Sequence, residues 1–323
     1  MTLRQITRPI RQELQTFQEV FKATMRSKVG LVDTIARYIV RQKGKKIRPI
    51  LVMLASKICG GPTLRTYRAA ALVEILHTAT LIHDDVVDGA DTRRGLASIN
   101  AIWKNKAAVL MGDYLLSRGL LLSLEKDDFY FLKVLSDAVR RMSEGEILQI
   151  EKSRRLNIDE ETYLKIISDK TASLLATCCE LGAASTTEDK KQWERMKAFG
   201  ENVGMAFQIR DDLLDYLGRK SIIGKPTGLD AKDKKLTLPL IHSLGKAPRR
   251  EKREILQIIK DKSRRDGATR ILEFVEKYGG IDYAISKAEH YSNLAREQLR
   301  AFPDSPSKDS LFDFVDFVME RSN

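Results

Sequence analysis

Residues 81–88 read Leu-Ile-His-Asp-Asp-Val-Val-Asp, and residues 207–215 read Phe-Gln-Ile-Arg-Asp-Asp-Leu-Leu-Asp. Both segments carry the pattern Asp-Asp-x-x-Asp inside an apolar, helical periodicity. At about 100° per residue, Asp84 and Asp88 lie about 40° apart on one helix face, and Asp211 and Asp215 repeat the arrangement. Like charges at this spacing destabilise a helix by roughly 0.2–0.5 kcal/mol. Two such pairs indicate that cations compensate them.

The rest of the sequence predicts an all-α fold. Apolar residues recur at intervals of three and four almost everywhere, and period-two alternation is scarce. No long flexible linker divides the sequence, so we expect one helical domain over residues 1–323. Helices are expected at 10–24, 28–43, 47–59, 64–90, 105–124, 128–153, 160–185, 188–218, 236–243, 250–262, 266–277, 280–302 and 306–321.

The segment 218–235 is the exception to this helical pattern. It is glycine-rich and basic, and it directly follows the second aspartate group. A loop of this length in a compact protein is usually functional or disordered. We expect it to form a mobile lid that brings Lys225 and Lys235 over a ligand held by the aspartates.

The composition limits the possible partners. The net charge is +12, but the basic residues are spread along the chain without a basic arm or an aromatic-rich RNA motif, which argues against nucleic acid. A positive field also attracts phosphorylated small molecules. Three cysteines without metal-ligand spacing predict no disulfide framework. No apolar run approaches the ~20 residues of a membrane span, so we expect a cytoplasmic protein without a transmembrane segment.

Magnesium is the cation that fits the aspartates. Mg²⁺ prefers oxygen ligands and is typically held by one or two carboxylates together with substrate phosphates. Zinc fits less well, because the sequence has four histidines and no His/Cys pair at ligand spacing. Asp85 and Asp212 lie roughly 100° off the two faces, so we expect them to orient the site rather than bind metal directly.

Groups that could hold a diphosphate occur in clusters. Pro49 at a helix start puts Lys45 and Arg48 near the positive end of that helix. His77 lies two turns before Asp84, within about 20° of the same face. The other candidates are Arg93, Arg94, Lys170, Thr171 and the two lid lysines, and Gln208 shares the face of Asp211 and Asp215. Each cluster alone is typical of a solvated surface; together with the aspartates they favour a phosphate site.

An ordered series of motifs supports this interpretation. It comprises Gly-Lys-Lys-Ile-Arg-Pro (44–49), the first aspartate segment, Arg-Arg-Gly (93–95), Gly-Asp-Tyr (112–114), Glu-Gly-Glu (144–146), Lys-Thr-Ala (170–172), the second aspartate segment and Thr-Leu-Pro-Leu (237–240). With this series, the chain resembles trans-type isoprenyl diphosphate synthases, the polyprenyl synthetase family, over nearly its full length.

The resemblance implies the isoprenoid synthase fold, a single-domain helical bundle around a deep central cavity with the aspartate helices facing each other across its mouth. It implies about three Mg²⁺ ions bound by Asp84, Asp88, Asp211 and, less firmly, Asp215. Isopentenyl diphosphate would be held by Lys45, Arg48, His77 and Arg94. The allylic diphosphate would be held by Arg93, Lys170, Thr171, Gln208, Lys225 and Lys235. The family also implies a homodimer.

The implied reaction ionises the allylic C–O bond, joins the allyl group to isopentenyl diphosphate and releases a proton. The departing diphosphate itself would take that proton, so no side chain is identified as a catalytic base. In the family, bulky residues four or five positions before the first motif stop elongation early. Ala79 and Thr80 are small, and Leu76 lies on the same flank. A long all-trans product near C40, as used for quinone side chains, is therefore expected.

Several alternatives stay open at this level. A short-chain farnesyl or geranylgeranyl diphosphate synthase would share the motifs, as would a non-catalytic subunit of a heteromeric synthase, although such subunits typically lose the aspartates or arginines. A terpene cyclase would leave Lys45 and Arg48 without a second diphosphate to bind. A phosphohydrolase is disfavoured because no histidine or glutamate is placed to activate water.

Overall fold

Helices form almost the whole described chain, which confirms the all-α expectation. The computed structural model describes residues 2–42, 44–93, 95–220, 236–261 and 266–320. The helices are α1 (Leu3–Ile6), η1 (Arg8–Ile10), α2 (Arg11–Thr24), α3 (Gly30–Arg41), α4 (Ile47–Ile58), α5 (Leu64–Val87), α6 (Ile99–Leu124), α7 (Phe129–Arg155), α8 (Glu160–Ile167), η2 (Ser168–Ala172), α9 (Ser173–Ala184), α10 (Lys190–Lys220), α11 (Leu238–Lys246), α12 (Arg249–Lys260), α13 (Gly267–Lys277), α14 (Gly280–Leu299) and α15 (Pro306–Glu320). One hairpin pairs strands β1 (Thr92–Arg93) and β2 (Leu96–Ala97).

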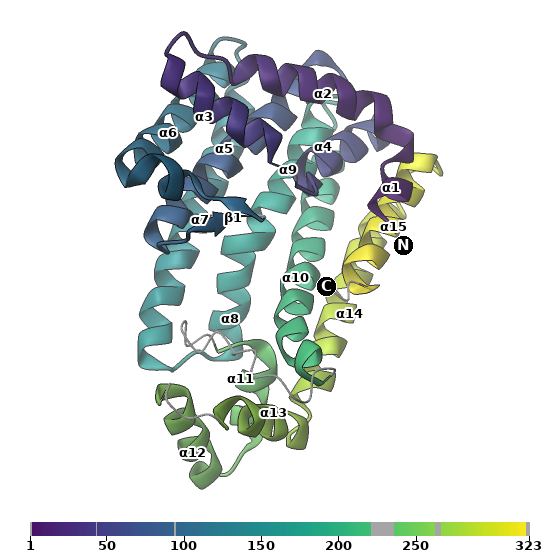
Figure 1. The fold of residues 1–323 in the computed structure, drawn as a ribbon. Helices are drawn as coiled ribbons and strands as arrows, with labels where there is room; N and C mark the ends of the chain where they lie inside the picture. The colour runs from purple at the N-terminus through teal and green to yellow at the C-terminus, as the bar shows by residue number, and fades with distance from the viewer. Residues whose placement is uncertain (1, 43, 94, 221–235, 262–265, 321–323) are drawn as a thin grey trace.

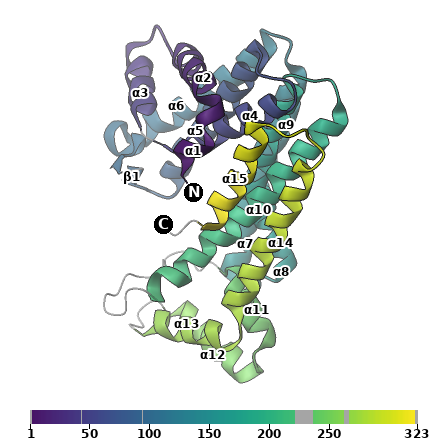
Figure 2. The same ribbon diagram turned by 90° about the vertical axis from the view of Figure 1, so that its right-hand side faces the viewer.

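The long helix α10 is the centre of the packing. It lies against α9 and α14, while α9 also packs on α4 and α5 packs on α6. Figures 1 and 2 show this bundle from two sides, with α11, α12 and α13 gathered at one end. The buried apolar residues form two clusters, and α10 contributes to both through Phe199 and Ile209. The helix that carries the second aspartate group is thus anchored along most of its length.

Local signals explain where α5, the first aspartate helix, starts and stops. Thr63 and Thr66 form a reciprocal capping box at its N-terminus, in which the Thr63 backbone N–H donates to Thr66 Oγ1 at 2.9 Å. Such a box satisfies backbone donors that have no partner within the helix. Gly89 ends the helix with a φ of +62°, a conformation that glycine adopts at little cost. The chain then enters the hairpin.

The expected helices are confirmed, with four differences. The hairpin and the short α1 and η1 were not predicted, because segments this small carry no clear periodicity. The expected helix 160–185 is divided into α8, the π-helix η2 and α9. α6 begins before its expected start and is kinked at Lys104, where φ is +69°. Residues 218–220 belong to α10 rather than to the expected lid, and 221–235 lie outside the described residues.

Helix α6 is unusually apolar for a helix on the outside of a bundle. Among the described helices, it alone is long and apolar enough to cross a membrane, and 33% of its most apolar window is buried. Length and composition alone are weak support for a span, because core helices of soluble proteins share them. The exposed part of α6 nevertheless needs a physical explanation.

Candidate active site

The first aspartate group occupies the C-terminal end of α5. Asp88 is the C-cap, and its backbone N–H donates to the Asp84 carbonyl oxygen at 2.8 Å. The side chains of Asp84 and Asp88 are exposed. Carboxylates at this end of a helix also oppose the helix dipole, whose negative pole lies there. The helix dipole is therefore a second unfavourable interaction, besides the repulsion between the two carboxylates, and both favour a bound cation.

Asp85 has a different environment from its two neighbours. It is buried, and Arg93 of β1 donates from Nε to Asp85 Oδ1 at 2.8 Å, with Nη2 bonded to the same oxygen. A guanidinium held by two donors to one carboxylate has a defined orientation. Asp85 thus places Arg93 beside Asp84. The orienting role of Asp85 remains a prediction, and Arg93 is the residue that it would orient.

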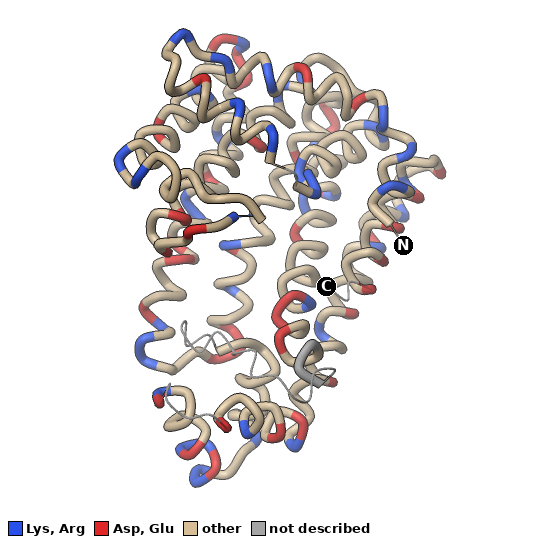
Figure 3. The backbone as a smooth tube through the Cα atoms, viewed as in Figure 1, with Lys and Arg blue, Asp and Glu red and all other residues tan. Residues whose placement is uncertain are grey.

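Charges from other elements converge on Asp84. Although the Asp84 side chain reaches solvent, the surrounding protein atoms partly desolvate it and raise its pKa, and the negative charges of Glu146 on α7 and of Asp88 raise it further. The positive charges of Lys170 on η2 and Arg93 on β1 lower it. Glu146 of α7 and Lys170 of η2 are therefore within electrostatic range of the acidic end of α5. Figure 3 shows acidic segments beside the hairpin and on the lower half of α10, with basic segments between them.

The π-helix η2 connects the two halves of the site. Lys170 forms an ion pair with Glu146 and donates to Gln149 Oε1 at 3.4 Å, both on α7. The next residue, Thr171, donates from Oγ1 to Gln208 Oε1 at 2.7 Å on α10. Two consecutive residues therefore reach two different helices. Lys170 lies on the side of the first aspartate group, and Thr171 lies on the side of the second.

The second aspartate group is ordered around Asp212. Gln208 Nε2 donates to Asp212 Oδ1 at 2.9 Å, and the Tyr163 hydroxyl donates to Oδ2 at 2.7 Å. Burial raises the pKa of Asp212 to about 6; the charges of Asp211 and Asp215 act in the same direction, against the two hydrogen bonds. Asp211 is half-buried and Asp215 exposed. Asp212 therefore faces its protein partners.

Gly204 of α10 lies against the backbone of η2. A Cβ at Gly204 would lie 2.5 Å from Ala172 Cα. The approaching group is the backbone of η2 rather than a ligand. The glycine thus lets α10 come close enough for the contact between Thr171 and Gln208.

Two cavities flank these residues. One of about 100 Å³ lies between α7, α8, η2 and α10, and its polar lining includes Gln149, Tyr163, Lys170, Thr171, Gln208 and Asp212. The other, of about 170 Å³, lies between α2, α3, α5 and the hairpin, and its lining includes Lys46, Glu74, Thr78, Asp85 and Arg93. Arg93 and Asp85 thus border the second cavity, and Lys170 and Thr171 the first.

Lys45 and Arg48, both predicted to hold isopentenyl diphosphate, lie on either side of Lys46, which lines the second cavity. α4 begins at Ile47, so Arg48 is in its first turn, and Lys46 just before it has a left-handed φ of +47°. Burial lowers the pKa of Lys46, and Glu74 of α5 opposes that effect. Lys45 is exposed, with Nζ 5.9 Å from the centre of the Phe317 ring. The cationic start of α4 therefore adjoins α5.

Other predicted contacts are only partly described. His77 is buried on α5, and its phosphate contact stays a prediction. Arg94, Lys225 and Lys235 lie outside the described residues.

The flank predicted to set product length packs against α6. Leu76 is in contact range of Gly119, Ala79 is fully buried, and Thr80 donates from Oγ1 to the His77 carbonyl oxygen at 2.8 Å. Nearby, His83 Nε2 lies 3.5 Å from Asp113 on α6. An elongating chain that follows this flank would run along the seam between α5 and α6.

The carboxylates fit magnesium only in combination with a substrate. Within the described ranges, no three Asp, Glu, His or Cys side chains lie close enough to hold a metal ion. Each aspartate group offers two carboxylates on one face. Mg²⁺ keeps several waters and takes further oxygens from phosphates, so this donor set fits Mg²⁺ bound together with a diphosphate.

Sequence patterns alone did not assign a role to three residues of the site. Glu146 pairs with Lys170, Tyr163 bonds Asp212, and Arg141 bonds Asp169 of η2. The Glu-Gly-Glu motif at 144–146 was a signal for Glu146. Tyr163 and Arg141 sit in ordinary helical patterns, and their partners are remote in sequence.

Comparison with known proteins agrees with this geometry. The polyprenyl synthetase family model matches residues 29–275. The all-trans-nonaprenyl-diphosphate synthase (geranyl-diphosphate specific) of Rhodobacter capsulatus is 34% identical over 98% of this chain and 97% of its own. Octaprenyl diphosphate synthase of Escherichia coli K12 is 33% identical over 99% of each chain.

Solved structures of similar proteins extend the match to the fold. A decaprenyl diphosphate synthase from Rhodobacter capsulatus superposes with a TM-score of 0.92 at 31% identity, covering 100% of both chains. A polyprenyl synthase from Caulobacter crescentus CB15, in complex with calcium and isoprenyl diphosphate, gives a TM-score of 0.88 at 32% identity, covering 100% of this chain and 98% of that one. Sequence motifs, fold and relatives agree, and the chain belongs to the polyprenyl synthetase family.

Proposed function

We propose that this trans-polyprenyl diphosphate synthase uses Mg²⁺ to extend an allylic diphosphate with isopentenyl diphosphate to an all-trans product near C40, for quinone side chains. One observation carries the proposal: η2 presents Lys170 toward the first aspartate group and Thr171 toward the second. A diphosphate lying between the groups would meet cations and polar donors from both sides. The long-chain relatives support the product class.

The residues of the chain act on the leaving diphosphate. When the allylic C–O bond breaks, its electron pair leaves with the diphosphate, and negative charge grows on the phosphate oxygens. Arg93, held by Asp85, and Lys170 stabilise that charge more in the transition state than in the ground state. Mg²⁺ bound by Asp84, Asp88, Asp211 and Asp215 would supply further positive charge.

The new carbon–carbon bond then forms from the double bond of isopentenyl diphosphate. Lys45, Arg48, His77 and Arg94 are proposed to hold the diphosphate of this second substrate. The departed allylic diphosphate accepts the proton that is lost. Gln208, bonded to Thr171 and Asp212, links the donors of η2 to the second aspartate group. Lys225 and Lys235 are proposed to join from the lid.

We also propose that residues 1–323 form one domain in the cytoplasm. The contribution of α10 to both buried clusters supports a single domain. The three cysteines are free and buried, which suits a reducing compartment.

Product length is tested at Ala79. Purified protein given farnesyl diphosphate, isopentenyl diphosphate and Mg²⁺ is expected to yield products near C40 by mass spectrometry. Replacing Ala79 with Val, Leu and Tyr in turn should shorten the product stepwise, because each side chain fills more of the seam between α5 and α6. Leu64→Tyr, at the exposed start of the same helix, is the control. Unchanged length in folded variants would place the limit elsewhere, and products of the wild type that stop at C20 would support the short-chain alternative.

The metal assignment is tested with Asp84→Asn, which keeps size and removes charge. Turnover should fall roughly a hundredfold or more, because bound metals contribute several kcal/mol to the barrier reduction. The metal-free variant should unfold at the same or a higher temperature than the wild type, because partial desolvation and Glu146 raise the pKa of Asp84 and its charge opposes folding. Asp91 is exposed and lies beyond the motif, so Asp91→Asn should change neither the turnover nor the unfolding temperature. Wild-type turnover in Asp84→Asn would remove Asp84 from the metal ligands.

We propose a homodimer formed through α6. Five residues of this helix, 40–59% exposed, fall within an arc of about 120°: Val109, Leu110, Leu120, Leu121 and Leu124. Asp113 and Ser117 are exposed within the same arc, so the apolar residues form two groups, near the middle and the end of the helix. Exposed apolar residues clustered on one face commonly mark an interaction surface. A second copy of the chain presents the same face and can cover it symmetrically.

Light scattering after gel filtration tests the dimer. The wild type should have twice the mass of the chain, and Leu110→Glu with Leu121→Glu should be monomeric, because buried glutamates at the interface would lose their solvation. Leu64→Glu, on a residue exposed outside this face, should remain dimeric. A monomeric wild type would refute the proposal, as would a dimeric double variant.

A further inference from the structure

The π-helix η2 is a special backbone element at the centre of the site. It interrupts the helical run from Glu160 to Ala184 with five residues, Ser168–Ala172. A π-turn has i→i+5 hydrogen bonds, is rare, and usually occurs at functional sites. Because it is wider than an α-turn, it changes the direction in which the following side chains point. Lys170 and Thr171 lie inside it, so their directions depend on its persistence.

The packing around η2 leaves little room for its backbone to move. A Cβ at Gly145 of α7 would lie 3.0 Å from Asp169 Cβ and 3.2 Å from the Lys170 nitrogen. On the other flank, Gly204 of α10 is close to Ala172. The backbones of α7 and α10 thus hold the turn on two sides, but apolar contact alone does not fix its rotation.

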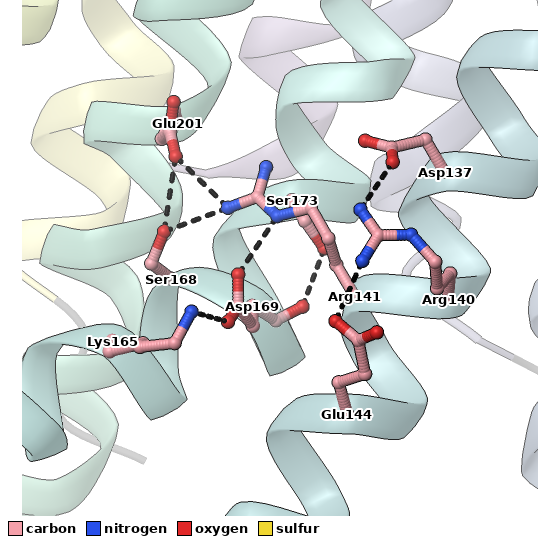
Figure 4. A network of polar contacts seen from close by, with 9 residues as sticks. All are labelled: Asp137, Arg140, Arg141, Glu144, Lys165, Ser168, Asp169, Ser173 and Glu201. Atoms are coloured by element: carbon pink, nitrogen blue, oxygen red, sulfur yellow. Dashed lines mark hydrogen bonds and ion pairs between the residues drawn. The ribbon is translucent and has the colours of Figure 1, made fainter.

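Arg141 of α7 supplies directional contacts to the same turn. Its Nε donates to Asp169 Oδ1 at 2.8 Å, and its Nη2 donates to Ser168 Oγ at 3.0 Å and to Glu201 Oε1 at 3.3 Å on α10 (Figure 4). Ser168 Oγ in turn donates to Glu201 Oε1 at 3.1 Å. One guanidinium therefore joins α7, the first two residues of η2 and α10.

The carboxylate of Asp169 depends on this arrangement. It is buried, and its second partner, Lys165, donates to Oδ2 at 2.9 Å from a side chain that is 65% exposed. A buried carboxylate that loses a charged partner carries a large penalty. Without Arg141, a backbone shift that moves Asp169 toward water would lower the free energy of the carboxylate. Lys170, the next residue, would move with it.

We infer that Arg141 is a positioning residue: by holding Ser168 and Asp169, it keeps η2 in its π-conformation and so aims Lys170 and Thr171 at the allylic diphosphate. The inference rests on the proposed function, because it assumes that these two residues bind that diphosphate. Arg141 itself bonds Asp169, Ser168 and Glu201, which are not among the residues proposed to contact the diphosphate. Its effect on the substrate is therefore indirect.

The chain offers a matched control one residue away. Arg140 donates to Asp137 at 2.6 Å and to Glu144 at 2.8 Å, all on α7, and its side chain is 58% exposed. Figure 4 shows these contacts apart from η2. Arg140→Gln and Arg141→Gln thus remove the same charge from the same helix, and only the second affects the π-turn.

The test compares the two substrates. Arg141→Gln should raise the KM for farnesyl diphosphate roughly ten- to hundredfold, since misplacing a binding group by about 1 Å can have such an effect. The KM for isopentenyl diphosphate should change by less than about threefold. Affinity for inorganic diphosphate with Mg²⁺, measured by calorimetry, should fall by a factor similar to that for farnesyl diphosphate. Arg141→Lys should recover part of the loss, and Arg140→Gln should behave as the wild type.

Other outcomes separate the inference from the proposed function. A lower melting temperature with unchanged KM values, or equal changes for both substrates, would reduce Arg141 to a structural brace and overturn the inference. Lys170→Ala tests the underlying assignment: an unchanged KM for farnesyl diphosphate in this variant would overturn the role of Lys170 itself.

A second variant is available if Arg141→Gln does not fold. Ser168→Ala removes one contact of Arg141 without leaving a buried charge unpaired. It should still raise the KM for farnesyl diphosphate alone, and an unchanged KM would again overturn the inference.

Discussion

Electrostatic repulsion between carboxylates is the constraint on which the site depends. Asp84 and Asp88 share a face at the negative end of α5, and the charge of Glu146 adds to theirs. No helix gains stability from this arrangement. The fold supports it by anchoring α5 and α10 in buried apolar clusters. We propose that bound metal and substrate offset this repulsion.

The fixed cations are distributed so that they do not neutralise the aspartates completely. Arg93 is committed to Asp85, and Lys170 to Glu146. Each cation is thus held by a carboxylate that is not itself expected to bind metal. This pairing keeps the cations oriented without substrate, and preorganised charges avoid reorganisation during the reaction. Asp212 has a similar supporting position, with hydrogen bonds from Tyr163 and Gln208.

Much of this could be predicted from sequence, and the exceptions have physical causes. Helical periodicity and the Asp-Asp-x-x-Asp spacing gave the all-α fold and the aspartate faces, because both are local properties of the chain. The hairpin and the π-turn are too short to leave a periodic signal. The partners Tyr163 and Asp212 are 49 residues apart, and Arg141 and Glu201 are 60 apart. No local pattern connects such pairs; only the packing of α7, α8 and α10 does.

We propose that metal and diphosphate complete one site together. The aspartates supply too few ligands to hold the metal alone, and too much negative charge to hold the diphosphate alone. By linkage, each ligand should then strengthen the binding of the other by the same factor. Calorimetric titration of the wild-type protein with inorganic diphosphate, with Mg²⁺ and with a chelator, measures this factor directly. Mg²⁺ should tighten diphosphate binding by about tenfold or more, and Mg²⁺ alone should bind weakly. Equal diphosphate affinity in the presence of the chelator would contradict a shared site.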